Sequence, residues 1–341
     1  MKRHPIRILF LLTLGLFSAL WSLNSAYAGT FQIAPKGNKK IKVAVMDLIS
    51  SVAVAPYVNN WYKKHAAERK WELKIFDLHG DFANARPTME NIITAGYDAI
   101  LVNWTDFKYY DDLIMKAYKM GIPVQGVACG NMKPGVVSHG AGTDIPTGGA
   151  SAQYLCSRLK EGQKILAYHD PRLASSLDRF HAAKLAFDTY LIKVQELQFP
   201  GSGDPYQVCY ENVKNALLAD DRKEIKGIWT PYESFGISAA RAANDMGRMD
   251  VIVVTGDDSP STYSEFRNLP TLQATVGTLG FAPIWTAQLF KNLDKIFAGK
   301  PFADGEVWFM LPYLVTRENL PPKGYFFSYC GYRGKPDFEV K

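Results

Sequence analysis

Short apolar runs alternate with longer amphipathic segments along most of the chain. Segments of four to seven residues, either mostly apolar as at 42–47 or alternating as at 72–77, are bounded by turn residues and predict strands. They cover residues 42–47, 72–77, 97–103, 122–127, 135–139, 164–168, 194–199, 227–230, 250–255 and 271–276. Segments with helical spacing lie at 56–70, 83–95, 110–120, 153–159, 176–192, 205–218 and 283–297. Strands separated by helices indicate repeated βαβ units with parallel sheets, and their number predicts two α/β domains.

The first 28 residues follow a different pattern. A basic segment, residues 2–7, precedes an apolar stretch at 8–23, and Ala26 and Ala28 then provide a small-x-small site. This order is typical of a secretory signal peptide that is cleaved before Gly29. The stretch is short for a membrane span, although an uncleaved anchor is the alternative. We therefore expect a mature protein that is soluble outside the cytoplasm.

Composition narrows the classes of function further. Removing the leader leaves 313 of the 341 residues, enough for two domains. Apolar residues make up 47% and charged residues 21%, which are globular values. The net charge of +6 falls to +3 without the leader's three Lys and Arg residues, which is too weak to indicate nucleic-acid binding.

Motifs for cofactors and metals are missing from the sequence. No G-x-G-x-x-G follows the first strand of either half, and the glycine-rich segment 139–149 lacks the P-loop Lys-Ser/Thr. That segment is better interpreted as a crossing between domains. The four cysteines, Cys129, Cys156, Cys209 and Cys330, form no C-x-x-C pair. They allow three complete disulfide pairings, or they are buried free thiols. We expect no cofactor and no metal.

Several segments, taken in order, carry a likeness to a known family. Examples are Asn103-Trp-Thr-Asp106, Gly121-Ile-Pro-Val124, Val136-Val-Ser-His139 and Val253-Val-Thr-Gly-Asp257. Further matches are Asp144 with Gly148-Gly149, the segment 212–218 and the segment 311–319. Together they resemble the type I periplasmic binding proteins, in the ribose and sugar-binding branch. The likeness spans nearly all of residues 41–320.

The resemblance implies an architecture. The fold would be α/β, with two doubly wound parallel-sheet lobes joined by a three-stranded hinge. The N-terminal lobe would comprise 41–142 plus 278–304, and the C-terminal lobe 143–277 plus 305–341. The ligand would lie between the lobes, at the carboxyl ends of the strands.

Residue-by-residue matching to the family implies a set of ligand contacts. Arg179 and Asp257 match an arginine and an aspartate that bind ligand from the C-terminal lobe. A surface arginine and a helix cap are the alternatives. Asp47 ends the first strand, where the family places a polar contact and where a turn also favours Asp. Arg179→Ala and Asp257→Ala are each expected to abolish binding and leave the fold intact.

Four further residues fall at positions where the family uses aromatic or polar contacts. They are Tyr57, Trp104, Tyr232 and Thr278. Aromatic faces suit the C–H faces of a sugar ring, and hydroxyl groups suit its edges. Packing within the core is the alternative for each of them.

One segment departs from the family pattern. Sugar binders commonly have Asp-Arg after the fourth strand, whereas this chain has Ala128-Cys129-Gly130-Asn131. The change removes charge-assisted hydrogen bonds of about 1.5–3 kcal/mol each. Cys129 and Asn131 occupy this place in the expected site. A less hydroxylated, more apolar or differently charged ligand becomes plausible.

The resemblance implies a monomeric solute-binding receptor that passes a small polar ligand to the permease of an ABC importer. A sensing partner of a membrane histidine kinase or chemoreceptor is the alternative. A secreted enzyme is a second alternative, with Cys129, His169, Asp170 and His181 as candidate parts, but no catalytic motif accompanies them. A repressor would need a DNA-binding segment where the leader stands.

Overall fold

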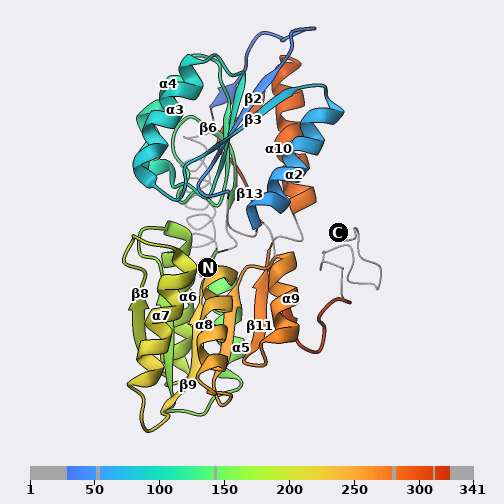
Figure 1. Ribbon diagram of the computed structural model, residues 1–341. Helices are drawn as coiled ribbons and strands as arrows, with labels where there is room; N and C mark the ends of the chain where they lie inside the picture. Colours follow the sequence, from blue (N-terminus) through green and yellow to red (C-terminus); the bar gives the residue numbers. More distant parts are fainter. Residues whose placement is uncertain (1–28, 51–53, 142–143, 279–281, 310–311, 323–341) are drawn as a thin grey trace, which may run out of the picture.

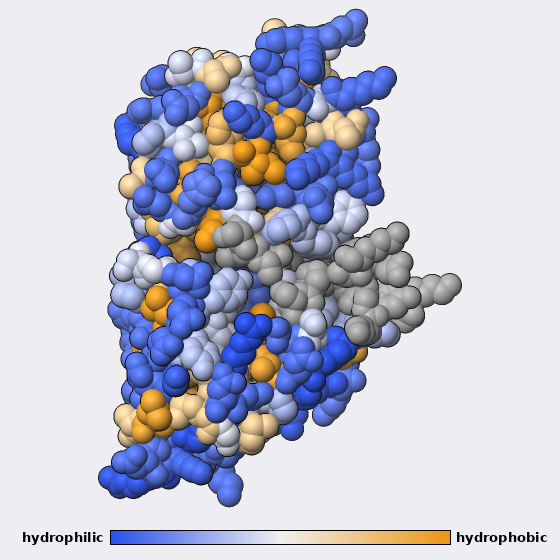
Figure 2. Space-filling view, viewed as in Figure 1, coloured by the Kyte–Doolittle hydropathy of each residue, from blue (hydrophilic) through white to orange (hydrophobic). Residues whose placement is uncertain are grey.

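The computed structural model describes residues 29–50, 54–141, 144–278, 282–309 and 312–322 and contains two lobes, one above the other in Figure 1. The predicted leader, residues 1–28, lies outside this part of the chain, as does Cys330. No helix among the described residues has the length and apolar character needed to cross a bilayer. The visible surface is largely hydrophilic, with smaller apolar patches on both lobes (Figure 2).

The first lobe is built on a six-stranded parallel sheet. In spatial order the strands are β13 (Glu306–Phe309), β6 (Val136–Ala141), β5 (Val124–Val127), β4 (Ala99–Asn103), β2 (Lys42–Asp47) and β3 (Glu72–Asp77). Helices α2 (Val54–Glu68) and α10 (Ala282–Phe297) cover one face, and α3 (Ala85–Thr94) and α4 (Asp111–Lys119) cover the other (Figure 1). Alternate residues of the central strands pack into the two separate cores, as expected for a sheet buried on both faces.

The second lobe repeats this plan. Its strands are β14 (Tyr313–Thr316), β11 (Leu272–Gly277), β10 (Ile252–Gly256), β9 (Ile225–Thr230), β7 (Lys164–His169) and β8 (Lys193–Gln198), all parallel except β14, which is antiparallel to β11. Helices α5 (Asp144–Cys156) and α6 (Ala174–Thr189) pack on one face. Helices α7 (Pro205–Leu218), α8 (Glu233–Asp245) and α9 (Pro260–Asn268) pack on the other.

Short elements complete the described chain. Strands β1 (Thr30–Phe31) and β12 (Phe302–Ala303) form a small antiparallel pair. Two 3₁₀ turns, η2 (Phe82–Asn84) and η3 (Phe107–Tyr109), follow β3 and β4. Both begin at an aspartate whose side chain accepts a backbone hydrogen bond. They place Phe82 and Tyr109 beyond the carboxyl ends of the strands, where both residues contact Arg172 of the second lobe.

The described chain passes between the sheets three times, after β6, β11 and β13. The expected return to the second lobe at residue 305 has to be corrected, because β13 pairs with β6 of the first sheet. The buried Asn292 donates to Glu306 at 3.1 Å, and Trp308 donates to Ser138 at 3.2 Å. These contacts fix residues 306–309 to the first lobe, and the return follows at β14.

The helix expected at 153–159 begins earlier, at Asp144, and includes Gly148 and Gly149. A Cβ atom on Gly148 would lie 2.1 Å from the backbone oxygen of Arg179 in α6. The glycine therefore permits close helix packing, at the expense of helix propensity. The described cysteines, Cys129, Cys156 and Cys209, are buried free thiols, which favours that alternative over bridges among them.

Candidate ligand-binding cleft

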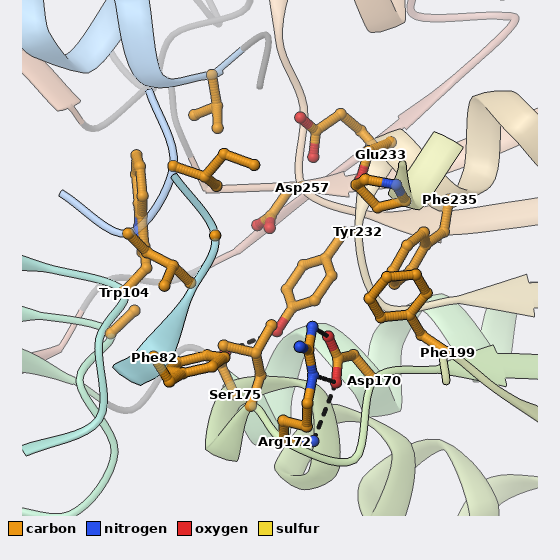
Figure 3. A pocket seen from close by; sticks show the side chains of 18 of the residues that line it. Phe82, Trp104, Asp170, Arg172, Ser175, Phe199, Tyr232, Glu233, Phe235 and Asp257 are labelled. Carbon is orange, nitrogen blue, oxygen red and sulfur yellow. Dashed lines mark hydrogen bonds and ion pairs between the residues drawn. The ribbon is translucent and has the colours of Figure 1, made fainter. Parts of the chain in front are cut away.

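A cavity of about 400 Å³ lies between the lobes, where the strands of both sheets present their carboxyl ends. The two walls differ in chemistry (Figure 3). The first lobe contributes mainly apolar side chains: Leu48, Ile49, Val54, Trp104, Val127 and Trp285. The second lobe contributes most of the polar ones, including Asp170, Arg172, Ser175, Arg179, Glu233 and Asp257. The cavity can therefore accommodate a molecule with one apolar and one polar side.

Backbone strain is concentrated at the rim of this cavity. His79, Trp104, Ala128 and Asp257 have φ angles of 55°, 57°, 51° and 58°, in the left-handed region that favours glycine. All four lie just beyond the carboxyl ends of strands and line the cavity. Such strained positions persist where surrounding contacts fix them, and they are frequent at ligand sites.

Arg179 is held in place by the second lobe itself. It is 4% exposed, and its Nε donates to Asp144 at 2.8 Å. Its Nη1 donates to the Pro231 carbonyl and to Asp257, both at 2.7 Å. The guanidinium carbon also lies 5.0 Å from the centre of the Tyr232 ring. A surface role for Arg179 is therefore excluded.

These contacts correct the expectation that Arg179→Ala leaves the fold intact. Removing one partner of a buried ion pair leaves an uncompensated charge, at a cost of about 3–5 kcal/mol. Here Asp144 and Asp257 would both lose their cation. Asp257→Asn is the milder way to disturb this part of the cavity, because the side-chain shape is kept.

Asp257, Thr278 and Tyr232 meet on the polar wall. Thr278 donates from Oγ1 to Oδ1 of Asp257 at 3.1 Å, and Tyr232 and Ser175 share a hydrogen bond of 2.7 Å. Burial raises the pKa of Tyr232, so its hydroxyl stays protonated at neutral pH. Both the carboxylate and the hydroxyl pair line the cavity. This wall offers acceptors and donors to the edge of a polar ligand.

Glu233, the first residue of α8, also lines the cavity and is 3% exposed. Its side chain forms no ion pair or hydrogen bond with another of the described residues. Burial raises the pKa of this carboxyl well above its usual range, and the negative charges of Asp257 and Asp258 add to the effect. Nothing in the sequence around Glu233 indicates a ligand contact, because Pro-Tyr-Glu-Ser has the composition of an ordinary helix start.

A contact between the lobes closes one side of the cavity. Arg172 lies between Phe82 of the first lobe and Phe199 of the second, 5.5 Å and 5.0 Å from the two ring centres. Tyr109 of the first lobe donates to the backbone oxygen of Arg172 at 3.2 Å, and Leu173 packs against the first lobe's core. We call Phe82, Tyr109, Arg172 and Leu173 the latch.

The structure brings Trp104, Arg179, Tyr232, Asp257 and Thr278 together around the cavity. The other four predicted contacts do not line it. Asp47 is fully buried and accepts from Ser50 at 3.0 Å and Asn59 at 2.9 Å. Burial raises its pKa.

Tyr57 lies on α2, half-buried against the core of the first lobe. Cys129 is fully buried, with its thiol donating to the Val102 and Val127 carbonyls, and burial raises its pKa. Asn131 is exposed. The segment that replaces Asp-Arg thus gives the cavity Ala128 alone, which explains part of the apolar wall.

The candidate parts of an enzyme are dispersed. His169 is buried, stacks on Phe180 and pairs with Glu196 at 2.8 Å, whereas His181 is exposed on α6. Asp170 is tied to Arg172 at 2.8 Å. Among the described residues, no group of three or more His, Cys, Asp or Glu side chains is arranged to hold a metal ion.

Comparison with known proteins shows which family this chain is similar to. The sequence profile described as "Periplasmic binding protein domain" matches residues 40–300. The ribose import binding protein RbsB of Haemophilus influenzae is 23% identical over 242 residues, which cover 70% of this chain and 82% of that protein. RbsB of Escherichia coli K12 is 23% identical over 244 residues, covering 70% and 81%.

Solved structures share the fold at lower identity. A sugar ABC transporter protein from Yersinia enterocolitica has a TM-score of 0.75 at 18% identity, with 86% of this chain and 90% of that chain covered. A Caulobacter myo-inositol binding protein bound to myo-inositol has a TM-score of 0.73 at 18% identity, covering 84% and 97%. A 5-methylthioribose binding protein from Thermotoga lettingae has a TM-score of 0.73 at 18% identity, covering 84% and 89%.

Proposed function

This chain belongs to the periplasmic binding protein family, and from that premise we propose that it is a solute-binding receptor of an ABC importer. It captures a small polar ligand, a sugar or a sugar-like molecule, between its two lobes and delivers it to the permease. The family and the sequence of the leader both support a periplasmic location.

The observation that carries the proposal is the cavity between the lobes. Its walls come from strand ends of both sheets, so a ligand there would contact both lobes at once. Phe82, Arg172 and Leu173 of the latch border this space. A ligand that bridges the walls favours the closed arrangement of the lobes by its differential affinity for it.

The names of the relatives favour import over the alternatives. The curated relatives are ribose import binding proteins, and the structural neighbours include sugar-binding components of ABC transporters. No relative of this set is described as an enzyme. Three of the candidate parts of an enzyme, Cys129, His169 and His181, do not line the cavity, which supports the same conclusion.

The decisive experiment identifies the natural ligand. The folded protein is purified from the periplasm of the cells that produce it. It is then denatured, and the small molecules that it releases are identified by mass spectrometry. We expect one solute at near-stoichiometric amounts that raises the melting temperature when it is added back. Asp257→Asn should reduce that shift strongly. Steady chemical conversion of the solute by the protein would contradict the proposal.

A further inference from the structure

The polar wall of the cavity carries more negative than positive groups. Four carboxyl side chains, Asp144, Asp170, Glu233 and Asp257, lie on it or contact it, against the two cations Arg172 and Arg179. Arg172 is committed to Asp170 at 2.8 Å. Arg179 is shared by two carboxylates. Even with Glu233 protonated, one negative charge is left over.

Among the described residues, Glu233 is the carboxyl of this wall that no other residue pairs with or hydrogen-bonds. Apart from its own backbone N–H, which favours the ionised form, the described chain offers its carboxyl no hydrogen bond. It is 97% buried, since only 3% is exposed, and it lies on the same side of the cavity as Asp257 and Tyr232 (Figure 3). The described residues leave this largely buried carboxyl unpaired, and because it borders the cavity, a ligand there can supply its partner.

The opposite wall is unsuited to a ligand that is polar on all sides. Trp104, Trp285 and the aliphatic side chains around them provide no charged group. The titratable side chains that the first lobe adds, His79 and Asp81, are both exposed. A sugar with hydroxyl groups on both faces would leave one set of them without hydrogen-bond partners here, which would weaken its binding.

We propose that the ligand is a small organic cation with an apolar body, whose positive centre lies against Glu233 and Asp257 while its body packs on the Trp104 wall. This inference rests on the proposed receptor function and replaces the sugar or sugar-like ligand of that proposal with a cationic one. The aromatic ring of Tyr232, which already lies beside a guanidinium, adds a face that attracts a second cation. Binding neutralises the surplus negative charge of the polar wall.

The test compares cations with neutral molecules of the same shape. Choline is paired with dimethylbutanol, its neutral carbon isostere, and phenethylamine with phenethyl alcohol; ribose and myo-inositol form a third arm. Binding is measured by thermal shift and by calorimetry. We expect at least one cation to bind about tenfold or more tightly than its neutral partner. A difference of this size is typical of one hydrogen bond or contact with a charged group.

Two variants test whether Glu233 is responsible for the preference for a cation over its neutral partner. Glu233→Gln keeps the side-chain shape but cannot ionise beside a bound cation, so the preference for the cation should fall to within about twofold. Glu161→Gln makes the same substitution at an exposed position of the same lobe and should leave the preference unchanged. The wild-type comparison stands even if Glu233→Gln folds poorly.

The outcomes separate this inference from the proposed function. If neither cation is preferred over its neutral partner, or if Glu233→Gln retains the full preference, the cation inference is overturned. Tight binding of ribose or myo-inositol without cation preference would also overturn it and leave the receptor function intact. The receptor function itself fails on a different result, the conversion of the co-purified solute.

Discussion

The imidazole of His139 makes the stability of this protein depend on pH. It is 1% exposed, its Nε2 accepts the Cys129 N–H at 3.1 Å, and its ring meets Phe107 edge to face. Burial lowers its pKa to about 4, although the nearby Asp106 opposes the shift. Between pH 6.5 and pH 4 the unfolded chain binds a proton that the folded chain excludes. Stability contributed by His139 is therefore present above pH 6.5 and is lost as the pH falls to 4.

His139→Gln keeps a hydrogen-bond acceptor and removes this titration. Between pH 7 and pH 5, the unfolding free energy of the wild type should fall by about 2 kcal/mol more than that of the variant. Urea unfolding at the two pH values measures the difference, and carboxylates that titrate in both proteins cancel. Equal losses in the two proteins would show that His139 is not held neutral by the fold.

The cavity shows which residues sequence matching could and could not find. Arg179, Asp257 and Trp104 follow strand ends or match family positions, and the structure brings them together. Glu233 has no such signal, because its burial results from packing between α8 and the rest of the second lobe. Asp47 occupies a matched position, yet Ser50 and Asn59 satisfy one of its oxygens within the first lobe. Position along a strand predicts proximity to the cleft, but side-chain direction depends on local partners.

Helix α5 carries two adjacent glycines with opposite packing. A Cβ on Gly148 would meet the Arg179 backbone at 2.1 Å, whereas one on Gly149 would have nothing within 4 Å. Gly148→Ala should destabilise the protein by about 1–3 kcal/mol or more, because two packed helices must separate. Gly149→Ala should stabilise it by up to about 1 kcal/mol through helix propensity. Thermal unfolding of the two variants shows whether each substitution lowers or raises the stability. Equal effects would contradict the close contact between α5 and α6.

The spacing of hydrophobic residues predicted well which segments are helices and which are strands. It predicted less well where each element begins and which strand it pairs with. The strands at 42–47 and 72–77 were predicted with their observed bounds, the first from a short apolar run and the second from the alternation of apolar and polar residues. The first half of α5 was missed, since its glycines suggest a loop until the packing of α6 is known. Strand β13 was recognisable as extended, but pairing with β6 depends on contacts across about 170 residues of sequence. The pattern of one segment does not contain that information.

The latch residues join the two lobes on one side of the cavity. Arg172 is anchored within the second lobe by Asp170 and by the Gly201 carbonyl at 2.8 Å, so it presents its guanidinium to Phe82 in a fixed position. Phe82 also packs on Tyr109, with ring centres 5.0 Å apart. The three chain crossings connect the lobes whether they are open or closed. The latch contacts are made across the cleft, so we expect a movement that opens the cleft to break them.

Phe82→Ala should therefore shift the ligand-free protein toward an open form. Losing one cation–π contact of about 0.5–1 kcal/mol changes the open-to-closed ratio by up to about fivefold. Small-angle X-ray scattering should show a larger radius of gyration without ligand and the wild-type value with saturating ligand, which should bind more weakly. Tyr154→Ala is the matched control, because it removes a cation–π contact, with Arg158 at 5.1 Å, inside one lobe. If Phe82→Ala and Tyr154→Ala give the same radius and the same affinity, the latch does not govern closure.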